Sequence, residues 1–283
     1  IRSHNYNLDF IFQGAITCTV ISSATTSFRY CPQGFLYSNS GYGMFFPVKE
    51  DLLPTLGFLN TNVVMNILSI LSPTIGFESG YLRKIPYLQT NQVVNKFVEE
   101  NIALSRNDWD SFETSWDFQQ HPLIRKVSTI DKAFDQWQAE CDDRFNQLKA
   151  NEEELNRIFI DIYGLQDELT PEVEDKDVTV RKANLGRDIR SFISYAVGCM
   201  FGRYSLDKNG LAYAGGEWDA SKYVSFAADK DNIIPICDDE YFEDDIAGRF
   251  VEFVKTVYGK DTLDENLKFI ADALGGTGQP KDV

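Results

Sequence analysis

The stretch at 52–88, LLPTLGFLNTNVVMNILSILSPTIGFESGYLRKIPYL, decides how the rest of the chain is organised. Its first twenty residues place apolar side chains at three- and four-residue steps, the spacing of one helix face. The apolar positions are Leu52, Leu56, Leu59, Val63, Ile67, Ile70 and Leu71. Ser72-Pro73 predicts the helix end, because proline lacks an N–H and pushes the preceding residue out of the helical region. We expect one helix, a connection over 74–80, and a short strand or extended edge over 82–86.

Residues 8–47 are rich in β-branched and aromatic residues and are interrupted by glycine, which predicts several short strands. Turns are expected at 32–34 and 39–41. If this segment contacts DNA, Arg29 could make a bidentate contact with guanine, and Asn39 or Asn5 could hydrogen-bond adenine. The hydroxyls at 22–27 could donate to phosphate oxygens. The alternative for Arg29 is a surface salt bridge or a clamp on a backbone carbonyl.

The net charge of −16 opposes DNA binding when it is taken as one number, because affinity for duplex DNA comes largely from neutralised phosphates. The charge is unevenly distributed, however. Residues 1–98 hold six basic and four acidic side chains, and residues 181–230 hold eight and five, while the remaining segments are acidic. These two segments are the ones expected to face DNA, with ordinary scatter of charge as the alternative.

Residues 130–162 carry the longest helical pattern, with a polar run at 149–154 that indicates either a turn between two helices or the solvated middle of one. We favour a helical arm or hairpin, ended by Gly164. Before it, a short helix near 93–98 is expected, followed by an aromatic stretch that reads as a linker pinned by its rings or as a base-stacking platform. The rings are Trp109, Phe112, Trp116 and Phe118. His121 has no partner histidine or cysteine nearby and is expected in a turn.

Residues 181–203 predict a helix with a basic edge, and Arg187 and Arg190 are its expected phosphate contacts. The alternative is a capped, salt-bridged helix packed against the acidic arm. Gly198 and Gly202 would permit close backbone approach, and a loop over 206–216 would lead to a small strand. Two further helices are predicted: one begins after the acidic block at 238–245 and ends at Gly259, and the other covers 263–274.

The Glu174-x-Lys176 pattern superficially suggests a metal-dependent nuclease, but a nuclease needs carboxylates that converge from separated strands. We therefore expect a solvated helix start or loop at 167–176 and no metal site. The five cysteines are scattered, without a CxxC pair, which argues against disulfides or zinc and favours a reducing cytoplasm. The chain starts at Ile1 without a signal sequence or a long apolar run, so we expect a soluble piece of a larger protein that does not enter membranes.

Three segments are distinctive in their residue order: 156–173 (NRIFIDIYGLQDELTPEV), 194–216 (SYAVGCMFGRYSLDKNGLAYAGG) and 231–254 (DNIIPICDDEYFEDDIAGRFVEFV). They resemble the C-terminal part of the PglX-type adenine-specific DNA methyltransferases of BREX phage-defence systems. The segments at 22–46, 56–64 and 71–88 resemble the target recognition domain of related fused restriction–modification enzymes. These resemblances together cover most of the chain.

The resemblance implies the DNA sequence-recognition and C-terminal portion of a site-specific adenine-N6 methyltransferase. Such an enzyme flips its target base into a catalytic domain that binds S-adenosylmethionine. The chain contains no Asn-Pro or Pro-Pro dipeptide, and therefore lacks the Asn/Asp-Pro-Pro-aromatic motif of these enzymes. We expect no catalytic residue, metal or cofactor in this chain. S-adenosylmethionine is expected to bind the catalytic domain, which this chain lacks. Whether this chain counts as part of an enzyme is left open.

With 283 residues, 43% of them hydrophobic, the chain can bury two cores. The expected fold is α+β: a strand-rich target recognition domain at 1–95, a helical spacer or arm at 96–180, and a mostly helical domain at 181–283. Double-stranded DNA is the expected partner, and a module that docks other defence-system proteins without touching DNA is the alternative. The expected DNA contacts are Arg29, Tyr30, Asn39, Ser27, Arg83, Lys84, Arg187 and Arg190.

Overall fold

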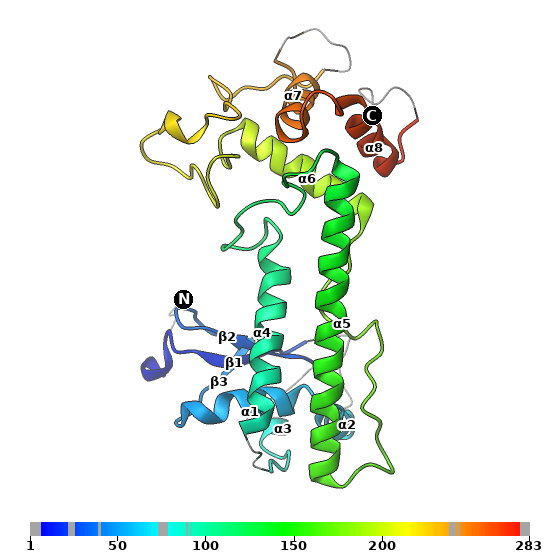
Figure 1. The fold of residues 1–283 in the computed structure, drawn as a ribbon. Helices are drawn as coiled ribbons and strands as arrows, with labels where there is room; N and C mark the ends of the chain where they lie inside the picture. Colours follow the sequence, from blue (N-terminus) through cyan, green and yellow to red (C-terminus); the bar gives the residue numbers. More distant parts are fainter. Residues whose placement is uncertain are drawn as a thin grey trace. The chain divides into compact units, whose positions relative to one another are not determined.

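The computed structural model describes residues 7–21, 26–38, 41–72, 79–88, 90, 92–237, 242 and 244–277, and the statements below concern these residues (Figure 1). The chain forms two compact units. Unit 1 consists of 1–105 and 146–179, and unit 2 consists of 106–145 and 180–283. The helices α4 (Asn95–Asp110) and α5 (Ile130–Tyr163) contribute residues to both units, so the segment expected as a spacer is shared between them.

Unit 1 contains a three-stranded antiparallel sheet in the order β2-β1-β3 (Figure 1). The strands are β1 (Ala15–Thr19), β2 (Phe28–Cys31) and β3 (Gly41–Met44). Thr17 of the central strand pairs with Arg29 on one side and with Gly43 on the other. A turn follows β2, where Gly34 has a φ of 102°, a conformation that glycine adopts without strain. The short strands confirm the prediction, and with the helices they confirm the α+β class.

The predicted helix at 52–71 is two helices, α1 (Leu52–Leu59) and α2 (Asn62–Leu71), with a bend of 74° between them. The reason lies in Asn60, whose carboxamide bonds the backbone of Phe28. Its Oδ1 accepts from the Phe28 N–H at 2.9 Å, and its Nδ2 donates to the Phe28 carbonyl at 3.0 Å. The helix therefore breaks at 60–61, where the Asn60 side chain satisfies the backbone groups of Phe28 on the edge strand β2. The apolar periodicity gives no sign of this break.

The extended edge predicted at 82–86 is also wrong. Leu82 is the last residue of a short helix, α3 (Ser79–Leu82), and a turn follows it. The Lys84 N–H donates to the carbonyl of Tyr81 at 3.0 Å, and the Ile85 N–H donates to that of Leu82 at 3.2 Å. The backbone groups that a strand would pair with a neighbour are thus satisfied locally. Pro73, the predicted helix end, lies outside the described residues.

The helix α5 is continuous over 34 residues, which excludes the hairpin and leaves the single long helix. The polar run at 149–154 is packed at Asn151, whose Nδ2 lies 3.0 Å from Glu100 Oε2 and 2.9 Å from Asn101 Oδ1 of α4. The helix ends before Gly164 (φ 66°), as predicted. The helix α4 is longer than expected and takes in Trp109.

The core of unit 1 forms where the sheet, α1, α2 and the second half of α5 meet. Phe58 is fully buried, and its ring stacks on Tyr163 at 5.5 Å and packs against Phe159 at 5.1 Å. Asn156 is also buried and accepts the first N–H of α2, from Asn62, at 2.8 Å. Burial of rings of this size is the main source of stability for a unit with such a small sheet.

Unit 2 is helical. Its core is built by α6 (Leu185–Met200), α7 (Ile246–Tyr258), α8 (Leu263–Leu274) and the first half of α5. The rings of Phe192, Tyr195 and Phe253 are fully buried at its centre. Asp245 caps α7 through the Gly248 N–H at 2.6 Å, and Gly259 and Gly275 end α7 and α8 where they were predicted to end.

Four short 3₁₀ helices complete the described elements: η1 (Leu8–Phe10), η2 (Lys49–Asp51), η3 (Gln92–Val94) and η4 (Ala220–Lys222). The small strand expected after 206–216 is not formed in the described residues, where the backbone instead forms bends and the short helix η4. Gly198 and Gly202 are as close to their neighbours as predicted: an added Cβ would lie 2.6 Å from the ring of Tyr204 or Trp218, respectively.

Within the described residues, each helix taken singly is too short or too polar to cross a membrane, and only the bent α1–α2 pair passes that test when its two halves are joined.

Candidate nucleic-acid interface

Arg29 lies on β2, an edge strand, with an exposed side chain. Its Nη1 donates to the carbonyl of Phe28 at 2.9 Å. This is the carbonyl clamp that stood as the alternative to base contact. The guanidinium forms no ion pair with a carboxylate of the described residues, so its positive charge is not neutralised by direct contact.

The surroundings of Arg29 are nevertheless desolvated. Burial lowers the pKa of Arg29, and the negative charge of Glu152 on α5 opposes that shift. Burial also raises the pKa of Glu152 to about 7, with the positive charge of Arg29 opposing the rise and Asp177 adding to it. A carboxyl of this kind is partly protonated near neutral pH, so Glu152 neutralises Arg29 only in part.

Tyr30 is 36% exposed and follows Arg29 directly. Successive side chains of a strand point to opposite faces, so Tyr30 and Arg29 do not share one surface. Ser27 is half-buried just before the strand. The expected contacts Asn39 and Asn5, and the hydroxyls at 22–25, lie outside the described residues.

Arg83 and Lys84 are exposed in the turn after α3. Arg83 lines a cavity of about 330 Å³ whose other described walls are mainly apolar side chains of the sheet: Ile16, Cys18, Phe28, Tyr42 and Met44. The Lys84 ammonium lies 5.5 Å from the ring centre of Tyr81. In unit 1 the expected DNA contacts thus divide between the two faces of the sheet.

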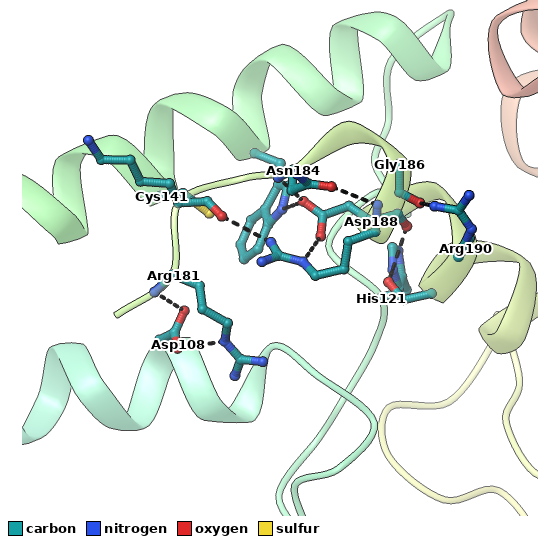
Figure 2. A network of polar contacts seen from close by, with 12 residues as sticks. Asp108, His121, Cys141, Arg181, Asn184, Gly186, Asp188 and Arg190 are labelled. Carbon is teal, nitrogen blue, oxygen red and sulfur yellow. Dashed lines mark hydrogen bonds and ion pairs between the residues drawn. The ribbon is translucent and has the colours of Figure 1, made fainter. Parts of the chain in front are cut away.

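In unit 2 the arginines at the start of α6 belong to a polar network (Figure 2). Its centre is Asp188, which is only 2% exposed. The Asp188 carboxylate accepts from Trp137 Nε1 at 3.0 Å, from the Asn184 N–H at 2.9 Å and from Arg187 Nε at 2.6 Å. Arg187 also donates to the carbonyl of Lys182 at 3.0 Å. The charge of Arg187 is thus paired with a buried carboxylate.

A second carboxylate, Asp108 on α4, is buried and holds Arg181 in the same way (Figure 2). It accepts from the Arg181 N–H at 3.2 Å and from Arg181 Nε at 3.1 Å. The guanidinium of Arg181 lies 3.6 Å from the ring centre of Phe112, and that of Arg187 lies 5.3 Å from it. Two of the arginines on the basic edge therefore hold the unit together, as the alternative reading of this helix expected.

Arg190, one turn further along α6, is different. It is exposed, and within the described part of the chain its Nη1 donates only to the carbonyl of Gly186, at 3.0 Å (Figure 2). A backbone carbonyl carries no net charge, so the cation of Arg190 stays available to an external anion. Of the two contacts predicted on this helix, only Arg190 presents an uncompensated charge.

His121 is the first residue of a turn, as expected, and its carbonyl accepts from the Ile124 N–H at 2.9 Å. Its side chain is buried. Its Nε2 lies 2.7 Å from Ser191 Oγ, and its Nδ1 accepts from the Leu123 N–H at 3.2 Å. Burial lowers the pKa of His121 to about 3, so the ring is neutral at physiological pH. The described residues contain no group of three or more side chains that could hold a metal.

The loop at 167–176 is solvated, as predicted. Lys176 and Glu174 form an ion pair at 2.6 Å, and both side chains are more than 70% exposed. An exposed pair of this kind contributes little to stability. It also lacks the converging second carboxylate that metal-dependent cleavage requires.

Sequence reasoning missed the two buried carboxylates, Asp108 and Asp188, and the partly protonated Glu152. One local signal was present for Asp188, since it is the single acid in the arginine-rich run RKANLGRDIR at 181–190. For Asp108 and Glu152 the partners are far away in sequence, at Arg181 and Arg29.

Along its whole length the chain is similar to the adenine-specific methyltransferase PglX of Lacticaseibacillus casei (strain Zhang), with 54% identity over 291 residues. The adenine-specific methyltransferase BrxX of Escherichia coli O9:H4 (strain HS) is 35% identical over 292 residues, which cover 95% of the chain. No family model matches the chain. The chain spans 24% of the length of each of these two relatives. The resemblance expected from its motifs is therefore confirmed, and the chain is similar to a segment of these two adenine-specific methyltransferases.

Proposed function

We propose that the chain is the DNA sequence-recognition and C-terminal portion of a site-specific adenine-N6 DNA methyltransferase of a phage-defence system. The observation that carries this proposal is the similarity along the whole chain to two adenine-specific methyltransferases that are about four times longer. Double-stranded DNA is the substrate that such an enzyme requires, and the cytoplasm is the place where host and phage DNA meet.

Chemistry is assigned to a part of the enzyme that this chain does not contain. The chain has no Asn/Asp-Pro-Pro-aromatic motif to hold a flipped adenine, so S-adenosylmethionine and the target base would bind elsewhere. The share of this chain is to select the site and hold the duplex. We place recognition in residues 1–95, a spacer in 96–180 and duplex support in 181–283.

Charge and exposure support this division of labour. Arg29 is a cation at a sheet edge without a direct carboxylate partner, which suits a bidentate contact with guanine in the major groove. Ser27 and Lys84 would contact the DNA backbone. Tyr30 and Arg83, which do not share the sheet face of Arg29, would contact a separate part of the DNA. Arg190 would hold a phosphate, and Arg187 would position the helix through Asp188.

A mobility-shift titration of the 283-residue chain with random duplex DNA tests the proposal. We expect weak retardation at low salt that disappears steeply toward physiological salt, because a few cations act on an otherwise acidic chain. Calorimetry with S-adenosylmethionine should detect no micromolar or tighter site. An absence of retardation even at low salt would contradict DNA recognition.

A second candidate function is the docking of other defence-system proteins by unit 2. It is favoured by the large apolar side chains exposed within 201–237: Phe201, Leu211, Trp218, Val224, Ile233 and Ile236. The double variant Val224→Asp with Ile236→Asp would separate the two candidate functions. If unit 2 docks another defence-system protein, the variant should no longer bind that purified protein, while its retardation of DNA stays unchanged. A partner retained by this variant would remove the docking candidate.

A further inference from the structure

A polar hollow of about 340 Å³ opens in unit 2, between the end of α4, the following loop and one face of α5. The α5 side chains that line it are Trp137, Glu140 and Arg144, at helical spacing. Asn107 and Gln119 contribute carboxamides to its wall. No step of the function proposed above makes use of this hollow.

The two arginines of the hollow differ in how well they are satisfied. Arg125 is fully engaged: its Nη1 and Nη2 donate to the Glu140 carboxylate at 2.6 and 2.8 Å, and its Nε donates to the carbonyl of Pro122 at 2.6 Å. This is a bidentate pair, the strongest arrangement for an arginine and a carboxylate. Arg125 is therefore not available to a ligand.

Arg144 has almost no hydrogen-bond partners. Among the residues that the structure describes, its Nη2 donates only to the sulfur of Cys141, at 3.2 Å, and its Nε is buried without a partner. Its Nη1 makes no hydrogen bond within the described residues, and its guanidinium lies 4.7 Å from the ring centre of Trp137. The guanidinium of Arg144 is thus held against the Trp137 ring with N–H donors that lack acceptors, an arrangement that favours binding of an oxyanion.

The charge of the hollow indicates which oxyanion fits. The charges of its lining side chains sum to zero, with Arg125 and Arg144 against Asp110 and Glu140. A neutral wall gives an anion little net attraction, and a dianion loses more hydration than a monoanion on entering it. The carboxamides of Asn107 and Gln119 can donate hydrogen bonds without adding charge. The Gln119 Nε2 donates one N–H to the carbonyl of Asp117 at 2.9 Å, which leaves its second N–H for a ligand. A phosphodiester carries one negative charge and two free oxygens, and matches this arrangement.

We propose that this hollow binds one phosphodiester group of a nucleic-acid backbone, with Arg144 as the charged donor and Asn107 and Gln119 as neutral donors. The inference rests on the proposed function, because it takes DNA to be the source of the phosphodiester. Binding at a neutral wall is weak and sensitive to salt, so the contact positions a duplex that other residues have already engaged.

Nuclear magnetic resonance of the Arg144 Nε–H group in the 283-residue chain tests the proposal directly. Titration with dimethyl phosphate, and separately with duplex DNA at low salt, should shift this signal. Inorganic phosphate, which is largely dianionic above neutral pH, should shift it less. Arg144→Gln should weaken duplex binding about tenfold, the effect of losing one charge-assisted contact. It should also reduce the slope of log affinity against log salt by about 0.9.

Arg106→Gln is the matched control, because Arg106 is an exposed arginine beside Asn107 that does not line the hollow. This variant should change affinity less than threefold. Gln119→Glu provides a second test that leaves the packing of Arg144 on Trp137 intact, and its added charge should weaken DNA binding as Arg144→Gln does. Duplex binding that is retained in both hollow variants would overturn this inference while leaving DNA recognition in place. A shift with dimethyl phosphate but none with duplex DNA would overturn nucleic acid as the source.

Discussion

Arg29 in unit 1 and Arg187 in unit 2 are both arginines in segments of basic composition, but their electrostatic surroundings are opposite. Arg187 donates to the buried carboxylate of Asp188 at 2.6 Å, inside a network that also holds Trp137. Among the described residues, Arg29 bonds only a backbone carbonyl, and the nearby carboxyl of Glu152 is itself partly protonated near neutral pH. The number of basic side chains in a segment therefore does not measure how much positive charge its surface has available to bind DNA. What matters is how many cations lack a buried partner.

The largest effect is expected in unit 2, from Asp188→Ala. The substitution leaves the donors of Trp137, Asn184 and Arg187 without their acceptor in a buried place, which should lower the free energy of unfolding by about 3–5 kcal/mol. Urea unfolding measures this change. Asp135→Ala on the exposed face of α5 is the control and should change the stability by less than about 0.5 kcal/mol. A loss below about 1 kcal/mol for Asp188→Ala would mean that the network does not hold the unit.

A pH effect on unit 2 comes next, through His121. Its pKa is lowered to about 3 in the folded chain, against 6.5 for the ordinary group. The unfolded chain therefore binds the extra proton, and the contribution of His121 is complete above pH 6.5 and is lost as the pH falls toward 3. Lowering the pH from 6.5 to 5 should remove about 1–2 kcal/mol of stability. This loss should be absent in His121→Gln, and an equal loss in that variant would assign the effect to other groups.

Unit 1 should respond to pH in the opposite direction, through Glu152. Its folded pKa of about 7 lies above the ordinary 4.5, so its contribution is present below pH 4.5 and is lost as the pH rises through 7. Glu152→Gln removes the buried charge and should be more stable than the parent chain at pH 8, by about 1 kcal/mol. We would measure the free energy of unfolding of the parent chain, His121→Gln and Glu152→Gln by urea unfolding at pH 5 and 6.5. The stability difference between parent and variant should change with pH in opposite directions for the two variants. Slopes of the same sign would contradict the contrast between the units.

A smaller effect, on binding alone, distinguishes two arginines of one helix. Arg190→Gln should reduce the salt slope of DNA binding by about 0.9, because one phosphate contact is lost, and should leave the folded state unchanged. Arg187→Gln should change the slope little and instead destabilise unit 2, since its charge is paired with Asp188. Salt titrations of both variants measure this. Equal slopes for the two variants would show that the Asp188 pair does not decide which arginine meets DNA.

Local signals explain what the sequence could predict about the fold. The ends of α7 and α8 follow from Asp245, Gly259 and Gly275, which act within a turn of their own helix. The break between α1 and α2 was missed because Asn60 serves a strand edge at Phe28, 32 residues earlier. In the same way, the strand predicted at 82–86 failed because local backbone bonds close a turn after α3.

The candidate site shows the same limit. Composition indicated which segments are basic, and the motifs indicated the family of methyltransferases. The buried partner of Arg181, Asp108, is 73 residues away. Asp188 follows Arg187 directly, but the side chain that donates to it in the core, Trp137, is 51 residues away. Which cation remains free therefore depends on the tertiary burial of these carboxylates, and the local sequence gives a signal only for Asp188.

The central claim, that Arg29 reads bases while the arginines of α6 do not, is tested most directly by methylome sequencing. Hosts would carry the full-length protein with Arg29→Ala or, separately, with Arg187→Ala and Arg190→Ala. We expect Arg29→Ala to relax one position of the methylated motif, by about 1–3 kcal/mol of discrimination, with little change in stability. The double variant should methylate the same motif at lower occupancy. An unchanged motif in the Arg29 variant, or an altered motif in the double variant, would contradict the account.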